Sequence, residues 1–411
     1  MLIKNASLPT DKGFKKVDIF IHQGVIEKID SSIDCPKDEQ ELIDATGLIV
    51  LPGFIDLNVR FSNSILNQSH IDKLALRCLK GGVTTAVVMS DFTPKLESAT
   101  LLELVKFKID QASIDIQMSA PLADQKEDQL HNMATFLNNG ASAILADSNR
   151  NANLLRRGMQ YALMKNKPIF VQCYEPNLDD SGVMNDGVIA SKLGLSGISK
   201  VSETTEVAKV SEMALVYQAD VVLKTLSTRR SLEIVAWQKQ KHPALFAEVS
   251  IHHLIKNDES CDGFNTYAKL MPPLREEKER LALIEALKEG KIDLLTSAHA
   301  PKSILYKDVA FEDAAFGLGS VEEFLTLAYT FLIKQGIIDF SKLIKLCAYN
   351  PALILKEPKK GRLEEGAVAD IILFDPTKSK TIDDKHSLYF GDTLYGEVKQ
   401  VIVDGALVFH Q

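Results

Sequence analysis

Eight short apolar runs, each followed by a longer stretch of helical period, constrain the fold of this 411-residue chain more than any other feature. Short runs rich in β-branched residues are typical of buried parallel strands, and the stretches between them are typical of helices that cover such a sheet. Eight strand and helix repeats predict an α/β fold, a closed (β/α)8 TIM barrel. The predicted strands are Gly53–Val59, Thr84–Met89, Asp115–Pro121, Ala141–Asp147, Pro168–Tyr174, Val221–Ser227, Leu245–Ile251 and Asp293–Ala298.

Two of the intervening stretches illustrate the helical pattern. Residues 275–290 present one charged and one apolar face. In the first stretch, apolar residues recur at i, i+3, i+4 and i+7 before a glycine pair that can end a helix. These residues are Ile71, Leu74, Ala75, Cys78 and the pair Gly81-Gly82.

Both ends of the chain have the alternating pattern of strands rather than the helical period. Residues 2–7 and 17–29 precede the barrel, and residues 370–374 and 397–409 follow it, with turn residues such as Asp404-Gly405 between them. Two terminal β segments that flank a barrel are expected to pair into one small β-sandwich. The predicted domains are therefore a composite sandwich of residues 1–51 and 356–411 and a barrel of residues 52–355.

Charge and composition narrow the classes of partner. A formal net charge of −8 argues against non-specific binding to nucleic acid or to an anionic membrane. No apolar run reaches about 18 residues and no secretory leader pattern opens the chain, so a cytoplasmic protein is expected.

The five cysteines are odd in number and never form a CxxC pair, which predicts reduced, mostly buried thiols. They are Cys35, Cys78, Cys173, Cys261 and Cys347.

Several motifs together resemble the cyclic amidohydrolases, and dihydroorotase and allantoinase in particular. The resemblance begins at Leu51-Pro52-Gly53-Phe54-Ile55-Asp56 and runs nearly to the end of the chain. It implies a metal-dependent hydrolase barrel. The other matching segments are Gly81-Gly82-Val83-Thr84-Thr85, Gly140-Ala141, residues 184–197, Ala247-Glu248-Val249, His252-His253-Leu254, Pro272-Pro273-Leu274-Arg275, His299-Ala300-Pro301, Asn350-Pro351-Ala352, Gly361-Arg362-Leu363, Gly366 and Ala369-Asp370-Ile371.

Members of that family use one or two divalent metals, usually zinc, to activate the attacking water. The resemblance implies a His-x-His pair on the first strand, because residues two apart on a strand point the same way. This chain has Asn58-Val59-Arg60 there. An amide is a weak zinc ligand, and a permanent cation opposes a dication by roughly 4 kcal/mol per unit charge at about 4 Å.

The remaining metal positions implied by the resemblance are altered as well. The bridging carboxylated lysine falls in residues 145–147, where Asp147 is the candidate carboxylate, and the histidines of strands five and six correspond to Gln172 and Thr225. The metal-binding and proton-shuttling aspartate of strand eight corresponds to Ala298, which can do neither. The sequence therefore predicts no intact catalytic set, no metal and no cofactor.

The substrate contacts implied by the resemblance have also changed. Ser62, Asp91, Met271 and Lys302 stand where the family has an arginine, two asparagines and a histidine. Together with Arg60 and His299 these four residues are the ligand-binding candidates at the barrel mouth. Arg60, Lys224 and Lys302 would suit a phosphate or carboxylate ligand, although internally paired or solvated cations are the alternative.

Three histidines and one glycine-containing segment could be parts of a functional site, and a structural role is the alternative for each. His252 and His253 are expected to be structural, with a ring hydrogen-bonded to backbone. His299, with Asp56 and Asp147, could instead form a reduced site for a single ion. The segment Gly317-Leu318-Gly319 lacks the third glycine of a dinucleotide-binding loop and is expected to be a loop.

Three functions follow from these observations. The first is a non-catalytic dihydroorotase homologue of pyrimidine biosynthesis, a structural or regulatory partner of aspartate carbamoyltransferase, with that partner implied by the resemblance alone. The second is an active dihydroorotase or related cyclic-amide hydrolase with an atypical site. The third is a sensor that binds a small molecule in the old substrate cavity. A homo-oligomer is expected in each case.

Overall fold

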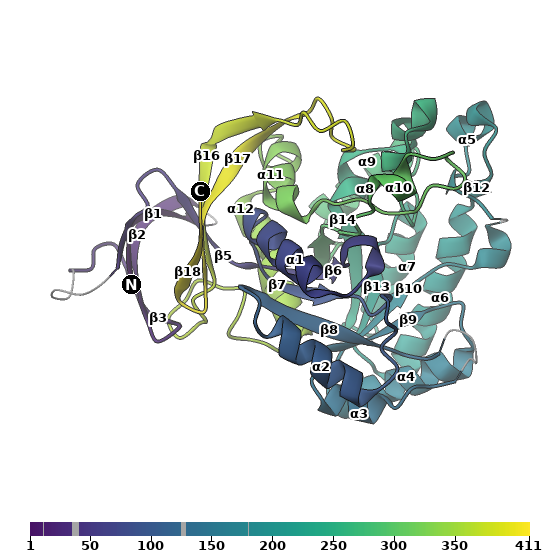
Figure 1. Cartoon of the computed structure of the whole chain (residues 1–411), viewed down its shortest axis with the longest axis horizontal. Coiled ribbons are helices and arrows are strands. Elements are labelled where there is room, and N and C mark those ends of the chain that lie inside the picture. The colour runs from purple at the N-terminus through teal and green to yellow at the C-terminus, as the bar shows by residue number, and fades with distance from the viewer. Residues whose placement is uncertain (11, 35–40, 125–128, 180) are drawn as a thin grey trace.

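The computed structural model of the chain describes residues 1–10, 12–34, 41–124, 129–179 and 181–411. These residues form a parallel barrel surrounded by helices and a separate β domain beside it (Figure 1). Both chain termini lie in the β domain, which is built from the first and last strands. The predicted (β/α)8 barrel with a sandwich formed from both ends of the chain is confirmed.

The barrel sheet has eight parallel strands in the order β15-β14-β13-β10-β9-β8-β7-β6. It closes where β6 and the segment after β15 meet, since the Arg60 amide donates to the His299 carbonyl over 2.7 Å and Val59 bridges to His299. The strands are β6 (Phe54–Val59), β7 (Val83–Val88), β8 (Asp115–Pro121), β9 (Ala143–Asp147), β10 (Ile169–Gln172), β13 (Val221–Lys224), β14 (Leu245–Ser250) and β15 (Leu294–Thr296).

Three barrel strands end two or three residues earlier than the apolar pattern predicts. The fifth was expected to reach Tyr174, yet β10 ends at Gln172. The sixth was expected to reach Ser227 and the eighth Ala298, yet β13 ends at Lys224 and β15 at Thr296. The chain enters the left-handed region at Thr225 (φ 48°) and at Ala298 (φ 48°), which departs from the extended dihedrals of a regular strand. Composition gave no sign of this turn, because neither residue is a glycine.

Helices cover the outside of the barrel, and shorter ones sit on its loops (Figure 1). The main helices each bury one apolar stripe against the strands, as Ile71, Leu74, Ala75 and Cys78 do in the first. They are α1 (Gln68–Lys80), α2 (Ala99–Ile109), α3 (Met133–Asn138), α4 (Ala152–Lys165), α6 (Lys200–Tyr217), α7 (Arg229–Lys239), α9 (Glu277–Lys288), α11 (Phe324–Ala328) and α13 (Asn350–Ile354).

The remaining short elements are mostly inserted between barrel strands. Two turns are π-helical, Tyr329–Ile333 (η6) and Lys345–Tyr349 (η7), and they continue α11 and α12 (Phe340–Ile344). The others are β11 (Met184–Asn185), β12 (Gly197–Ile198), α5 (Val188–Leu193), α8 (Ile251–Ile255), α10 (Ile304–Lys307), and the 3-10 turns η1 (Ser62–Ser64), η2 (Pro176–Leu178), η3 (Asp258–Phe264), η4 (Thr266–Ala268) and η5 (Val321–Glu323).

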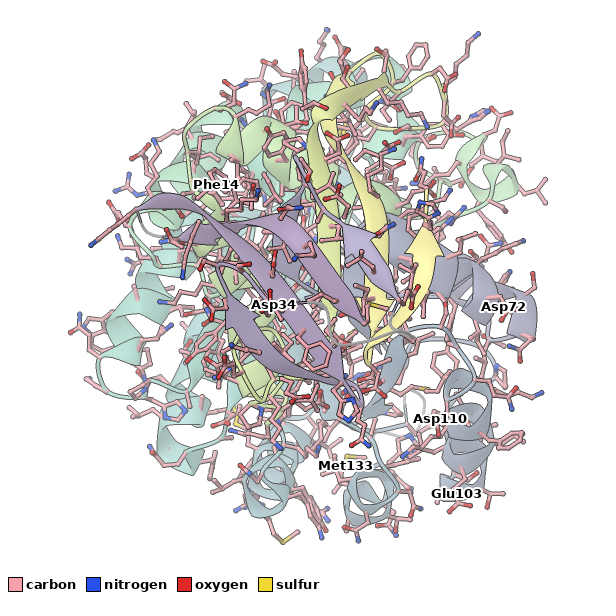
Figure 2. The ribbon with its side chains drawn as sticks, turned by 90° about the vertical axis from the view of Figure 1, so that its left-hand side faces the viewer. Phe14, Asp34, Asp72, Glu103, Asp110 and Met133 are labelled. Carbon is pink, nitrogen blue, oxygen red and sulfur yellow. The ribbon has the colours of Figure 1, made fainter. Side chains whose placement is uncertain are left out.

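The β domain is one sheet of eight strands, seen face-on in Figure 2. Its order is β18-β17-β16-β5-β1-β2-β3, with β4 paired to β1, so strands from the two ends of the chain meet where β5 pairs with β1 and β16. The strands are β1 (Leu2–Thr10), β2 (Gly13–His22), β3 (Val25–Asp30), β4 (Leu42–Asp44), β5 (Ile49–Pro52), β16 (Ile371–Thr381), β17 (Thr393–Val403) and β18 (Ala406–His410).

Three apolar clusters hold the molecule together. One lies between the barrel and its helices, and a second joins β1, β2 and β3 to β16 and β17 within the terminal domain. The third fills the barrel with large side chains from facing strands, such as Leu57, Phe170 and Val222.

The cysteines in the described residues are buried free thiols: Cys78, Cys173, Cys261 and Cys347. Cys35 lies outside the described residues. None of the helices in the described ranges has the length and hydropathy to span a membrane.

The close approach of helix α1 to the turn before α11 depends on Gly81. This residue has an ordinary φ of −88°, but a Cβ added to it would lie 1.7 Å from the Val321 carbonyl oxygen. We therefore expect Gly81→Ala to lower the free energy of unfolding by about 3 kcal/mol, because two backbones must separate. Gly366→Ala is the control, because Gly366 has φ 86° and open space around it, so only about 1 kcal/mol of backbone strain is expected. Urea denaturation compares the two variants, and equal losses would contradict the packing argument.

Candidate functional site: the mouth of the barrel

A cavity of about 470 Å³ opens at the carboxyl ends of the barrel strands. It is lined from β6, β7, β9, β10 and β13, among others, which is the end of a TIM barrel where side chains from different strands converge. Five of the residues singled out from the sequence line it: Arg60, Asp91, Asp147, Gln172 and Lys224.

An ion pair between Lys224 and Glu248 lies at the base of this cavity. The Lys224 Nζ atom is 2.5 Å from Glu248 Oε2, and the two side chains are 2% and 0% exposed. The ammonium group also donates to the Leu57 carbonyl over 2.7 Å and lies 5.1 Å from the centre of the Phe170 ring. A cation is therefore built into the interior of the barrel on β13.

The other carboxylate oxygen of Glu248 collects three neutral donors. Its Oε1 accepts from Asn58 Nδ2 over 2.7 Å, from Thr296 Oγ1 over 2.8 Å and from Thr225 Oγ1 over 3.3 Å. Asn58 Nδ2 also donates to Thr225 Oγ1 over 3.0 Å. Glu248 thus connects four strands, β6, β13, β14 and β15, through buried hydrogen bonds.

Opposing effects act on the pKa of Lys224. Burial lowers the pKa of this ammonium group, whereas the neighbouring Glu248 carboxylate raises it, and burial is the larger influence. The Lys224 ammonium group lies 2.5 Å from a fully buried carboxylate, so the two opposite charges balance each other. Removing either side chain would leave the charge of the other buried without a partner.

Arg60 lines the mouth cavity and pairs with Asp91, which follows the second barrel strand. Its Nε donates to Asp91 Oδ2 over 2.6 Å, and one of its terminal nitrogens donates to Asn58 Oδ1 over 3.1 Å. Arg60 and Lys224 are therefore both internally paired, which is the alternative that the sequence left open for these cations. Lys302 donates to Ser64 Oγ over 3.3 Å.

Two positions that the resemblance assigns to metal ligands, Asn58 and Thr225, are already engaged with Glu248. The Asn58 amide, the Thr225 hydroxyl and the Glu248 carboxylate bind one another, and the Lys224 ammonium group is in contact with the same carboxylate. Zinc requires free imidazole, thiolate or carboxylate donors in a tetrahedral arrangement. These residues do not fit a zinc ion as they are arranged.

Asp56 is buried beneath this network and supports the backbone. Its two carboxylate oxygens accept from the Asn58 amide over 2.9 Å and from the Ser297 amide over 3.0 Å. Burial raises its pKa, and the Ser297 hydrogen bonds oppose that change. Asp147 faces the cavity instead, where burial raises its pKa while Arg150 lowers it.

His299 and Lys302 lie in a different place from Arg60 and Asp91. They line a second cavity of about 420 Å³, together with Arg77, Lys307 and Glu322. The Nδ1 atom of His299 accepts from the Ser320 and Val321 amides over 2.9 and 3.2 Å. The structure does not bring His299 and Asp147 into one cavity, and Ser62 and Met271 line neither.

His252 and His253 serve the structure, as expected from the sequence. The Nε2 atom of His252 is 2.9 Å from the Ser297 carbonyl, and that of His253 is 3.2 Å from the Pro272 carbonyl. Their other ring nitrogens contact the Tyr389 and Ser250 hydroxyl groups.

Sequence reasoning missed the partners that fix this end of the barrel. Glu248 was noted only as part of a matching segment, although it stands two residues after the partly buried Phe246, as Lys224 stands two after the buried Val222. Adjacent strands carrying opposite charges at such positions are a recognisable signal. Another buried carboxylate, Glu203 of α6, accepts from the amides and hydroxyls of Ser227 and Thr228.

The fold is that of the amidohydrolases, and the family comparison agrees. Residues 49–408 match the model of the amidohydrolase family. The chain belongs to this family. The L-hydantoinase (dihydropyrimidinase) from Arthrobacter aurescens has the same fold, with a TM-score of 0.88 at 18% identity over 100% of this chain and 96% of that one. A D-hydantoinase from a Thermus species gives a TM-score of 0.86 at 20% identity, covering 100% and 95%.

Within the family, the chain is a dihydroorotase homologue. It is 31% identical to the dihydroorotase of Caldanaerobacter subterraneus subsp. tengcongensis, covering 97% of this chain and 94% of that protein. It is 32% identical to the dihydroorotase of Ruminiclostridium cellulolyticum, covering 99% and 98%. The dihydroorotase of Clostridioides difficile is 31% identical, with 100% of both chains covered.

Removing one member of the buried ion pair tests how it contributes to stability. We expect Lys224→Met to lower the free energy of unfolding by about 3 to 5 kcal/mol, because it leaves the Glu248 charge unpaired in the barrel. The double variant Lys224→Met/Glu248→Gln should recover at least half of that loss, since an amide oxygen can still accept from Asn58. Denaturant unfolding of the three proteins measures this. A single-variant loss under about 1 kcal/mol would contradict a matched pair.

The buried histidines predict how stability depends on pH. Burial lowers the pKa of His252 and His299 to about 3 and that of His253 to about 4, from 6.5. Below pH 6.5 the unfolded chain therefore binds more protons than the folded one, so this part of the stability is lost as the pH falls from 6.5 toward 4. His299→Gln, whose side-chain oxygen can still accept a backbone hydrogen bond, should reduce proton uptake on unfolding at pH 5 by about one. Unfolding at several pH values gives this number, and an unchanged slope would contradict a neutral His299.

Proposed function

We propose that this dihydroorotase homologue is a non-catalytic structural or regulatory partner of aspartate carbamoyltransferase in cytoplasmic pyrimidine biosynthesis. The observation that carries the proposal is the Lys224 ammonium group paired with Glu248 at the base of the barrel mouth. A dication at that place would meet a fixed positive charge and donors that already bind one another.

The end of the eighth strand supports the same proposal. The family resemblance implies a carboxylate at residue 298 that binds metal and moves the catalytic proton, and a methyl group stands there. The nearest carboxylate along β6, Asp56, accepts two backbone amides with its two oxygens. Neither residue is placed to take over the general acid and base work.

A partner role also requires a surface that another subunit can cover. Exposed apolar side chains gather on short elements above the barrel: Val188 of α5 and Leu305 of α10 are 82% and 80% exposed, and Phe264 of η3 is 51% exposed. The elements are tied together, since α5 packs on η3, and Thr266 and Lys307 exchange hydrogen bonds. Apolar patches of this kind mark protein interfaces.

The cavity at the mouth supports one alternative, a regulator that binds a small molecule without converting it. Its wall combines Asp147, Gln172 and Arg60 with a volume of about 470 Å³, which suits a small polar ligand. A ligand that raises the melting temperature and is recovered unchanged would favour this function.

The proposal predicts assembly without turnover. Mixed with the aspartate carbamoyltransferase of its own cell, the chain should co-elute as a stable complex, and Leu305→Asp should weaken the association at least tenfold. Phe107→Asp is the matched control, because Phe107 is 63% exposed on α2, which lies on the other side of the barrel from α10 in Figure 1. With added zinc and dihydroorotate, ring opening should stay at the rate without protein.

Two results would overturn the proposal. Turnover above about 1 s⁻¹, which is within the ordinary range of enzymes, would assign the chain to the active dihydroorotases. Failure to associate with the carbamoyltransferase, by wild type as well as by Leu305→Asp, would remove the partner.

A further inference from the structure

A third hollow, distinct from the two cavities described above, lies on the molecule away from the barrel mouth. It has a volume of about 840 Å³ and is formed where β2 and β5 of the terminal domain approach η6 and α12. Lys288, which ends α9 just before β15 begins, lies on its rim. It therefore opens at the end of the barrel where the strands start, opposite to the mouth. We call this hollow the basal groove.

Aromatic side chains form the floor of the basal groove. The Phe14 ring meets the Phe340 ring edge-on at 5.9 Å, and Tyr329 stacks on Phe340 at 5.9 Å and meets Phe374 at 5.1 Å. Phe14 is 58% exposed on β2, where Figure 2 labels it. Aromatic side chains that are partly open to solvent are the usual anchors of protein interfaces.

The helix under the floor has an irregular turn. Residues 329–333 form the π-helical turn η6, which begins at Tyr329 and is followed by Ile337 at the groove wall. π-Helical turns are rare in proteins, and those that occur are often found at functional sites. Nothing in the barrel mouth requires this turn, because the groove is at the other end of the molecule.

The rim of the basal groove is positively charged in a chain whose net charge is −8. Lys288, Lys334 and Lys342 line it, with Lys288 donating to Glu285 Oε1 over 2.9 Å, and Asp339 is the single acidic residue among its lining residues. Asp339 is engaged in capping α12, where its Oδ1 accepts from the Lys342 amide over 2.8 Å. The Lys334 ammonium group lies 4.0 Å from the centre of the Tyr395 ring, which holds it at the rim of the groove by a cation–π contact.

We propose that the basal groove is a docking site for an acidic peptide segment of a partner protein that carries an aromatic or large aliphatic side chain. Charge complementarity selects the acidic residues, and the aromatic floor selects the apolar anchor. A nucleic acid fits less well, because the floor of the groove is apolar and, apart from the few lysines of the rim, the chain has a net negative charge. This site is independent of the barrel mouth and of the carbamoyltransferase proposal.

A synthetic peptide tests the site directly on the full-length chain. Fluorescein-labelled EDEFEDLE is titrated by fluorescence anisotropy at 0.1 M salt, beside KKKFKKLK and EDESEDSE as charge-reversed and anchor-free controls. We expect saturable binding of the first peptide only, weakened at least fivefold at 0.5 M salt because rim charges are screened. Phe14→Ala should weaken binding at least fivefold.

Charge reversal on the groove rim supplies the matched comparison. Lys334→Glu/Lys342→Glu should weaken binding of EDEFEDLE at least tenfold, whereas Lys73→Glu/Lys108→Glu, which makes the same change of charge on exposed residues of α1 and α2, should change it less than twofold. Melting temperatures confirm that the variants fold.

Three outcomes would overturn the proposal: no saturation up to 1 mM peptide, equal binding of the charge-reversed or anchor-free peptide, or equal weakening by both double variants. Sedimentation velocity supplies the last distinction. Self-association that only the groove variant abolishes, without peptide binding, would assign the groove to a second copy of the chain and would also overturn the proposal.

Discussion

The buried contact between Lys224 and Glu248 organises the mouth of this barrel. Burying two charges costs several kcal/mol each, and only close geometry with further hydrogen bonds repays that cost. The structure supplies both, because Glu248 also accepts from Asn58, Thr225 and Thr296. Side chains that could have opened toward a ligand instead connect four strands. The interaction that opposes a metal ion is therefore also one that holds the barrel together.

The rest of the mouth follows from this arrangement. Asn58 is held by Glu248 and in turn accepts from Arg60, whose Nε atom donates to Asp91. His299, on the other side, is held by two backbone amides and faces a separate cavity. Arg60 and Asp91 line one cavity at the mouth, and His299 and Lys302 line another.

The sequence predicts the architecture well, because strands buried on both faces appear as continuous apolar runs. It predicts strand ends less well. Thr225 and Ala298 leave the extended conformation at φ 48°, and nothing in their composition marks this. The positions Asn58, Gln172, Thr225 and Ala298 could be found by resemblance, but the pairing of Lys224 with Glu248 depends on which strands are neighbours. Six residues were grouped into one ligand site, and only Arg60 and Asp91 share the first cavity, because loop paths after the strands cannot be derived from periodicity.

A crystal of the protein soaked in zinc, with anomalous diffraction recorded at the zinc absorption edge, tests the central claim most directly. The account predicts no anomalous peak within the barrel mouth and an unchanged contact between the Lys224 ammonium group and the Glu248 carboxylate. A strong peak coordinated by Asp147, Glu248 or Asp56, with Lys224 displaced from its place, would contradict it.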